Sequence, residues 1–451
     1  MASHSVLFRS IDAATAVDEF PKPAIFRDLN LDQVVNAITA GKRDYNLKPF
    51  FFSPLGNVDD IIYRQEVFQD LEDPAVHDLM AAFAGEQIVA RFAYRAREMR
   101  EDDHGFNHYH RARWFLNAAL QYCCAVVRLK SGLATADVRS RALLDLRSCL
   151  TDYVHSYAFT TLQAEANRLE AGLSAVRYCV LVKGDRISVG RYGDEADYSK
   201  QVLATFARFQ QGAVKNYLPK FRDWDTVAAA GVLDLVAKVY PDLFAALDTF
   251  CFQHSDYLDD IIRVLDREIQ FYLAYLEYIR PLREAGLTLS YPSMALTDKN
   301  EQIFDTFDLA LAAQLTKREA PVVCNGMTLT DPERIIVISG PDNGGKTTLA
   351  RTFGQLHYLA RLGCPVPGHD IRLFLCDQIF THFEKEEDIT TLAGKLQGEL
   401  NRLKADFDRA TADSVFILNE VFNSTTAQDA LSLSEQVLEK VTELDALGAR
   451  P

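Results

Sequence analysis

The chain has 451 residues, of which 48% are hydrophobic and 25% are charged. This composition excludes a disordered or fibrous protein, and the length predicts roughly two to four globular domains. Lys and Arg total 48 against 63 Asp and Glu, so the net charge is −15, which repels a nucleic-acid backbone at long range. Local basic stripes can still bind phosphate, so the charge lowers the expectation of DNA binding without excluding it.

The cysteines and the apolar runs indicate the cellular compartment of the protein. Eight cysteines are scattered along the chain, with no Cys-x-x-Cys pair and no zinc-ligand spacing, which predicts reduced and buried thiols. The N-terminus has no apolar run of signal length, and no stretch approaches about 18 uninterrupted apolar residues. We therefore expect a cytoplasmic protein with no membrane partner.

The residues from about 59 to 286 repeat apolar side chains at steps of three and four and contain few prolines, which predicts helices. Residues 258–279 predict one long amphipathic helix that packs lengthwise against another. Its apolar stripe consists of Leu258, Ile261, Ile262, Leu265, Ile269, Leu273 and Leu276.

One segment among these helices, residues 177–192, is rich in β-branched side chains around Gly184 and Asp185. This pattern predicts a β-hairpin. Its cations Lys183, Arg186 and Arg191 could contact phosphate, although solvated charges on an exposed strand are the more common meaning.

Beyond Pro321, short β-rich runs alternate with helical segments, which predicts a parallel sheet with crossover helices. The runs are Arg334–Ser339, Arg372–Cys376 and Ser414–Leu418. We expect three parts: an N-terminal segment over 1–50, a helical core over 51–300 that contains the hairpin, and an α/β nucleotide-binding domain over 301–451.

Residues 340–348 match the phosphate-binding pattern Gly-x4-Gly-Lys-Thr and lie between an apolar strand and a helix. In such a loop, backbone N–H groups surround the β-phosphate and the helix directs its positive end at the anion. Lys346 would neutralise charge on the β- and γ-phosphates, and Thr347 would ligate magnesium. The pattern predicts ATP and Mg²⁺ as cofactors, bound by Gly340, Pro341, Asp342, Asn343, Gly344, Gly345, Lys346, Thr347 and Thr348.

A second polar site follows the apolar run Ser414–Leu418, which ends in Asn419 and Glu420. A phosphate-binding loop needs such groups on a neighbouring strand to hold the metal and the attacking water. Glu420 is the candidate that polarises water, so Glu420 and Lys346 are the catalytic candidates. Asn419 occupies the usual place of a magnesium-orienting aspartate; its amide adds no charge, so we expect weaker magnesium binding and slower turnover. The alternative is a buried strand that ends in an exposed turn.

These motifs resemble the MutS family of mismatch-repair ATPases, whose ATP domain is similar to that of ABC transporters. Residues 340–348 resemble the family's Gly-Pro-Asn-Met-Gly-Gly-Lys-Ser-Thr, 377–381 its Asp-x-Ile-Phe-Thr, and 418–426 its Met-Asp-Glu-Ile-Gly-Arg-Gly-Thr-Ser. Residues 52–64 are similar to its Pro-Leu-x-Asp-x-x-x-Ile-x-x-Arg, which begins the lever helices. The resemblance implies a multidomain α and α/β fold: a long helical lever domain, then an ABC-type P-loop ATPase domain that is incomplete at its C-terminus.

Several family features are altered in this sequence. Only about fifty residues precede the lever motif, so we expect no mismatch-reading domain. The aromatic that the family places against adenine corresponds to Val322, whereas Asn325 is kept and is assigned to the nucleotide. The family's Ser-Thr-Phe, which reaches the opposite subunit's γ-phosphate, corresponds to Gly394-Lys395-Leu396; Lys395 either substitutes for it or lies on a solvated helix face. The chain is also expected to end before a strand, a sensing histidine and the dimerisation helices.

Two functions remain open at this stage. The resemblance implies that ATP closes paired ATPase domains of a homodimer, with lever helices passing that closure to duplex or structured DNA. The alternative is a nucleotide-gated scaffold for protein interactions with little or no hydrolysis or DNA binding, which the acidic charge and Asn419 favour.

Overall fold

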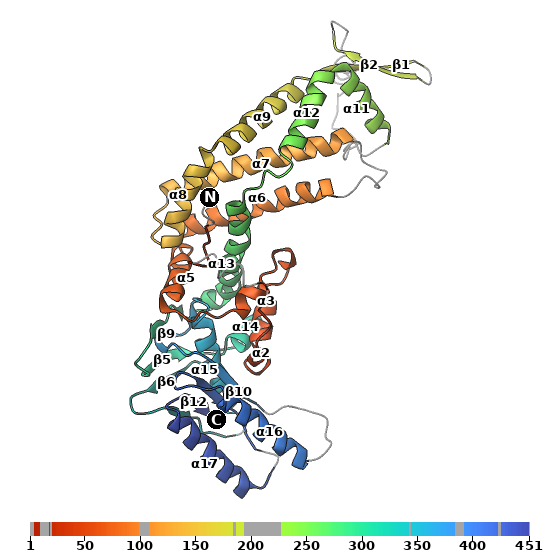
Figure 1. Cartoon of the computed structure of the whole chain (residues 1–451). Coiled ribbons are helices and arrows are strands. Elements are labelled where there is room, and N and C mark those ends of the chain that lie inside the picture. Colours follow the sequence, from red (N-terminus) through yellow and green to blue (C-terminus); the bar gives the residue numbers. More distant parts are fainter. Residues whose placement is uncertain are drawn as a thin grey trace, which may run out of the picture. The chain divides into compact units, whose positions relative to one another are not determined.

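The computed structural model describes residues 4–9, 18, 20–98, 108–183, 186–193, 227–341, 344–383, 392–422 and 425–450. The chain forms two compact units (Figure 1). The first contains Met1–Ala81, Leu133–Cys149 and Asp260–Pro451, and the second contains Ala82–Gly132 and Leu150–Asp259. Both helix and sheet are present, as expected of a multidomain α/β chain. Within the described ranges no helix is both long and apolar enough to cross a bilayer.

The helices divide between the two units. The first unit holds α2 (Ile25–Asp28), α3 (Leu31–Ile38), η2 (Arg43–Tyr45), α4 (Lys48–Phe52), α5 (Val58–Asp70), α13 (Asp260–Glu284), α14 (Leu309–Lys317), α15 (Lys346–Ala360), α16 (Leu392–Phe407) and α17 (Ala427–Glu443). The second holds most of α7 (His108–Thr135), with α9 (Tyr157–Ser174), α11 (Val227–Val239) and α12 (Pro241–Gln253). The residues of α6 (Pro74–Glu98) and α8 (Arg141–Val154) fall in both.

Helix α13 is the long helix that the apolar stripe predicts, and six of the seven stripe residues are buried in it. Burial extends around the helix, because Phe271, Tyr272 and Tyr275 are also fully buried. Phe271 packs against Phe51 of α4 and Phe68 of α5, with ring centroids 4.7 and 5.9 Å apart. The helix therefore forms the core of the first unit, whereas the sequence predicts an amphipathic helix with one apolar stripe.

The N-terminal residues 5–8 lie between α5 and α13 and hydrogen-bond to two buried charged groups. The Glu268 carboxylate of α13 accepts hydrogen bonds from Ser5 Oγ at 2.8 Å and from the Val6 amide at 2.7 Å. Arg64 of α5, which is fully buried, donates through Nε to the Leu7 carbonyl at 3.0 Å. These bonds compensate the cost of burying charge and fix the chain start in the core.

Stability is expected to depend on pH through Glu268. Burial raises the pKa of this carboxyl to about 7, despite the hydrogen bonds from Ser5, Val6 and Leu7. The stabilisation is therefore fully present below the unfolded-state pKa near 4.5 and is lost as the pH rises through about 7, a change of roughly 3 kcal/mol. Urea unfolding of wild type and Glu268→Gln at pH 5 and pH 8 tests this. Between these pH values the free energy of unfolding of wild type should fall by about this much relative to that of the variant, and an equal change in both proteins would contradict the prediction.

A four-stranded parallel sheet with the order β10-β11-β12-β7 lies in the first unit. Its strands are β10 (Ile379–His382), β11 (Val415–Leu418), β12 (Leu447–Arg450) and β7 (Ile335–Val337). Alternate residues of β11 face opposite ways: Phe416 and Leu418 pack in a cluster with side chains of α16 and α17, while Ile417 lies against α15. Helices thus cover both faces, as a parallel sheet requires.

Two expectations about this sheet are wrong. Residues 372–374 belong to a different, mixed sheet, because β9 (His369–Phe374) is followed after only four residues by β10, too short a link for a parallel crossover. The chain also does not end before the next strand: Leu447–Arg450 forms β12, which lies between β7 and β11.

The mixed sheet has the order β4-β9-β5-β6. Its other strands are β4 (Ser293–Ala295), β5 (Glu301–Thr306) and β6 (Asn325–Leu329), and a separate short pair joins β3 (Leu289–Ser290) to β8 (Val366–Pro367). Strand β9 runs parallel to β4 and antiparallel to β5.

The C-terminal end of α15 is tied to the helical core of the first unit. The Leu362 carbonyl accepts from Arg64 Nη1 at 3.2 Å, the Arg361 carbonyl accepts from the Leu55 amide at 2.8 Å, and Tyr358 Oη donates to the Phe51 carbonyl at 2.8 Å. Three hydrogen bonds from the residues around α4 and α5 therefore meet the C-terminal end of α15, and the N-terminal end of this helix follows the loop at 340–345.

Gly363 closes this junction, and its replacement is expected to be costly. Its φ is +75°, and an added Cβ would stand 2.6 Å from Arg64 Cβ and 3.1 Å from the Ile61 carbonyl oxygen. Gly41 has the same φ of +75° with nothing within 4 Å, so it is a matched control. Gly41→Ala should cost about 1 kcal/mol of backbone strain, and Gly363→Ala about 3 kcal/mol because overpacking is added. Urea unfolding measures both, and equal costs would contradict the crowding.

In the second unit, the two β-branched runs form the antiparallel strands β1 (Tyr178–Lys183) and β2 (Arg186–Arg191). The turn residues Gly184 and Asp185 lie outside the described residues. Arg191 donates to the Val239 carbonyl at 3.3 Å and lies 5.1 Å over the Tyr240 ring, so this cation binds other residues of the protein itself. Val180 and Leu181 are 44% and 54% exposed, which makes the hairpin surface partly apolar.

Candidate nucleotide site

The loop between β7 and α15 has the backbone that its glycines predict. Gly345 has a φ of +85° and directly precedes the first helical residue, Lys346. A Cβ on Gly344 would stand 2.9 Å from the Pro341 carbonyl oxygen, so no side chain fits there. The loop therefore turns tightly into the helix, whose first N–H groups face the loop. Asp342 and Asn343 lie outside the described residues.

Lys346 folds back over its own loop. Its Nζ donates to the Gly340 carbonyl at 2.8 Å and to the Pro341 carbonyl at 3.0 Å. The ammonium group is thus held against the backbone that the pattern predicts to surround phosphate. Thr347 and Thr348 follow in the first turn of α15 and are half-buried.

Asn419 directly follows β11 and is only 6% exposed. Its backbone N–H donates to the His382 carbonyl of β10 at 2.8 Å, but its side-chain Oδ1 is buried and has no hydrogen-bond partner among the described residues. A buried carbonyl oxygen without a donor costs free energy, so such atoms often mark a ligand position. Oxygen is also the ligand type that Mg²⁺ prefers.

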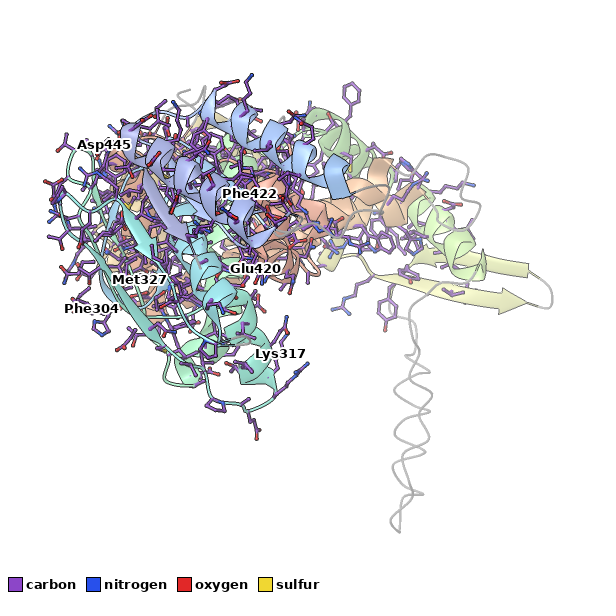
Figure 2. The ribbon with its side chains drawn as sticks, turned by 90° about the horizontal axis from the view of Figure 1, so that it is seen from below. Phe304, Lys317, Met327, Glu420, Phe422 and Asp445 are labelled. Carbon is purple, nitrogen blue, oxygen red and sulfur yellow. The ribbon has the colours of Figure 1, made fainter. Side chains whose placement is uncertain are left out.

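Glu420 has an exposed side chain and an unusual backbone, with a φ of +51°. Phe422, two residues later, also has a positive φ, +72°, and is fully buried in the cluster beneath α16 and α17 (Figure 2). Positive φ is costly for residues with a Cβ, and packing of Phe422 holds the turn in place. The sequence gives no signal for this strain.

The sheet topology brings the two motifs together. β7, β11 and β10 are all parallel, so the loop after β7, Asn419 after β11 and His382 at the end of β10 lie at the same edge of the sheet. One strand, β12, separates β7 from β11, which places the two motifs roughly 10 Å apart. Ligands of open α/β sheets bind at this edge.

The remaining predicted residues lie elsewhere or are only partly described. Asn325 begins β6 of the mixed sheet, where it is exposed and pairs with Thr306. The side chain of Lys395 lies outside the described residues, while Leu396 packs in the cluster with α17 and Glu399 is buried. Whether Lys395 substitutes for the family's Ser-Thr-Phe or lies on a solvated helix face therefore stays a prediction.

These residues fit a magnesium-bound nucleoside triphosphate. The loop offers a helix N-terminus and an ammonium group for phosphate, and the unpaired Oδ1 of Asn419 offers a buried ligand for a hard cation. In the described part of the chain, no group of three or more His, Cys, Asp or Glu side chains is arranged to hold a metal ion.

Comparison with known proteins identifies relatives of this region. The family model described as MutS domain V matches residues 336–448. The DNA mismatch repair protein MutS of Halothermothrix orenii is 33% identical over 120 residues, which is 27% of this chain and 13% of the relative. DNA mismatch repair protein MutS 2 of Halobacterium salinarum is 33% identical over 133 residues, 30% and 15% of the two chains. The similarity to these relatives therefore spans only about a seventh of their length.

Proposed function

This chain belongs to the MutS family, and on that premise we propose that it is an ATP-binding, DNA-interacting ATPase of the mismatch-repair type. One observation carries the proposal: the loop at 340–348 and the pair Asn419-Glu420 lie at the same edge of one parallel sheet. That arrangement supplies a phosphate cradle, a metal ligand and a carboxylate within reach of one nucleotide.

Each residue has a proposed role. Lys346 exchanges its two carbonyl partners for β- and γ-phosphate oxygens, and Gly340–Thr348 surrounds the phosphates with backbone N–H groups. Thr347 and Asn419 hold Mg²⁺, which neutralises phosphate charge when bound. Glu420 orients the attacking water. Asn325, exposed at the start of β6 in the mixed sheet, is assigned to the nucleotide by the family resemblance alone.

The junction at the end of α15 supports coupling to the helical part of the first unit. A shift of α15 on phosphate binding would be felt by Arg64, Leu55 and Phe51, because each hydrogen-bonds at its far end. We propose that this route carries closure of paired ATPase domains, in a homodimer, to the helices that meet duplex or structured DNA.

The alternative proposal is a nucleotide-gated interaction scaffold. Asn419 favours it, because an amide brings no charge to the metal and slow or absent hydrolysis would follow. The net charge of −15 favours it too, since it opposes association with DNA.

ATP binding and phosphate release on one preparation, with and without duplex DNA, separate the two proposals. The DNA-interacting ATPase predicts ATP turnover that DNA stimulates. Glu420→Gln should suppress this turnover without loss of ATP binding, and added salt should lower it steeply when DNA is present. If wild type binds ATP tightly but shows neither turnover nor DNA affinity, the DNA-interacting ATPase is overturned and the scaffold is supported.

A further inference from the structure

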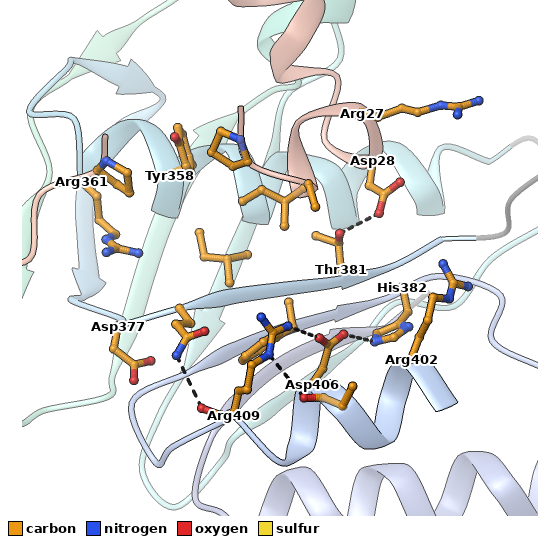
Figure 3. A pocket seen from close by; sticks show the side chains of 18 residues that line it. Arg27, Asp28, Tyr358, Arg361, Asp377, Thr381, His382, Arg402, Asp406 and Arg409 are labelled. Atoms are coloured by element: carbon orange, nitrogen blue, oxygen red, sulfur yellow. Dashed lines mark hydrogen bonds and ion pairs between the residues drawn. The ribbon is translucent and has the colours of Figure 1, made fainter. Parts of the chain in front are cut away.

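A second pocket, of about 620 Å³, lies beside β10 in the first unit (Figure 3). The residues before and in α2 form one wall, and the second half of α16 forms another. Tyr358, at the far end of α15, also lines it. Because Tyr358 is twelve residues beyond Lys346, this wall is roughly 18 Å along the helix from the phosphate-binding loop. The Tyr358 wall is therefore distant from the proposed ATP site, whereas the His382 end of the pocket lies at the same sheet edge as that site.

The carboxylates that line the pocket already have partners within the protein. Asp28 accepts a hydrogen bond from Thr381 Oγ1 at 2.7 Å, and Asp377 accepts from Ser414 Oγ at 2.8 Å. Asp406 pairs with His382 Nε2 at 2.8 Å and with Arg409. Burial opposes ionisation of Asp406, but these two partners outweigh it and lower its pKa. Asp406 is thus paired with a cation, whereas Asp28 and Asp377 are hydrogen-bonded to neutral hydroxyls.

Two of the lining cations are not compensated in this way. The guanidinium groups of Arg27 of α2 and Arg402 of α16 make no hydrogen bond or ion pair with any residue that the structure describes. Arg402 lies beside His382, and Arg27 lies next to Asp28 on the other side of β10 (Figure 3). Arg361, by contrast, donates to the Leu55 carbonyl at 3.1 Å. Two guanidinium groups on different walls, without a carboxylate partner among the described residues, offer donors to an anion on a chain whose net charge is −15.

Several of the other lining residues are apolar, and the pocket has the size of a small organic ligand. Ile25, Pro54 and Ile379 line the pocket beside Tyr358, whose hydroxyl is already bonded to the Phe51 carbonyl. Pockets of roughly 300–1,000 Å³ hold ligands of mononucleotide size. Phosphate matches two guanidinium forks better than a carboxylate does, since its oxygens can accept from both.

We propose that this pocket binds a phosphorylated small molecule of about mononucleotide size, with its phosphate between Arg27 and Arg402 and its organic part against Ile25, Pro54 and Tyr358. The site adjoins the proposed ATP site through one hydrogen bond, from the Asn419 amide to the His382 carbonyl at 2.8 Å. A ligand held against β10 is therefore positioned to influence Asn419.

Calorimetry on the full chain carrying Lys346→Ala tests the pocket with AMP and inorganic phosphate as probes, since that background removes the loop's lysine. We expect AMP to bind more tightly than phosphate, and Arg27→Gln with Arg402→Gln to weaken AMP binding at least about tenfold. Arg318→Gln, an exposed arginine outside the pocket, is the matched control and should change nothing. Thermal unfolding checks that each variant folds.

Three results would overturn the proposal: no binding of AMP or phosphate, AMP binding that the double variant leaves unchanged, or binding of a single-stranded oligonucleotide in place of AMP. The last would assign the two arginines to nucleic acid. ATP binding by the wild-type loop is measured separately, so failure of the pocket and failure of the ATP site are distinguishable.

Discussion

Replacing Lys346 with alanine is expected to weaken ATP binding about 100-fold. The lysine ammonium lies on the Gly340 and Pro341 carbonyls, so it is already at the loop that would hold phosphate. Charge-assisted hydrogen bonds contribute about 1.5–3 kcal/mol each, and the phosphates would lose one such partner and a neutralising charge. A loss of about 3 kcal/mol corresponds to roughly 100-fold in Kd. Titration with a fluorescent ATP analogue in the presence of Mg²⁺ measures it.

The control for this experiment is Lys317→Ala, which removes an exposed lysine in the last turn of α14. It should leave the Kd for ATP unchanged, because global charge changes equally in the two variants. If both lysine variants bind ATP as wild type does, the loop at 340–348 is not the ATP site, and both proposed functions fail with it.

Local patterns in the sequence predict those parts of the fold that depend on nearby residues. The loop at 340–348 is recognisable because glycine spacing and the Lys-Thr pair are confined to nine residues between a strand and a helix. Helix α13 is recognisable because its apolar repeat persists over more than 20 residues. In both cases one segment contains all the information that the prediction needs.

Features set by contacts between distant segments were not predictable in the same way. The run at 372–374 reads as a strand, but its sheet depends on pairing with β4 and β5. The left-handed backbone at Glu420 depends on burial of Phe422, and the unpaired oxygen of Asn419 depends on β10 next to β11. Arg27 and Arg402 are 375 residues apart in the sequence, and only the packing of α2 beside β10 places them in one pocket.

Replacing Asn419 with aspartate is expected to have opposite effects on stability and on turnover. Without a metal, an ionised carboxylate at a site that is 6% exposed and has no donor for Oδ1 among the described residues should destabilise the fold by about 1–3 kcal/mol. With Mg²⁺ and ATP, the added charge should strengthen metal binding about tenfold and raise phosphate release by at least as much.

Thermal unfolding without metal, together with phosphate release measured over a Mg²⁺ titration, tests both effects of Asn419→Asp. The double variant Asn419→Asp with Glu420→Gln is the control, because it keeps the added metal charge but lacks the carboxylate that we assign to the water. It should bind Mg²⁺ as tightly as the single variant and release little phosphate. A single variant whose Mg²⁺ dependence matches wild type would show that the unpaired oxygen of Asn419 is not a metal ligand, and the slow hydrolysis expected of the alternative function would then need another cause.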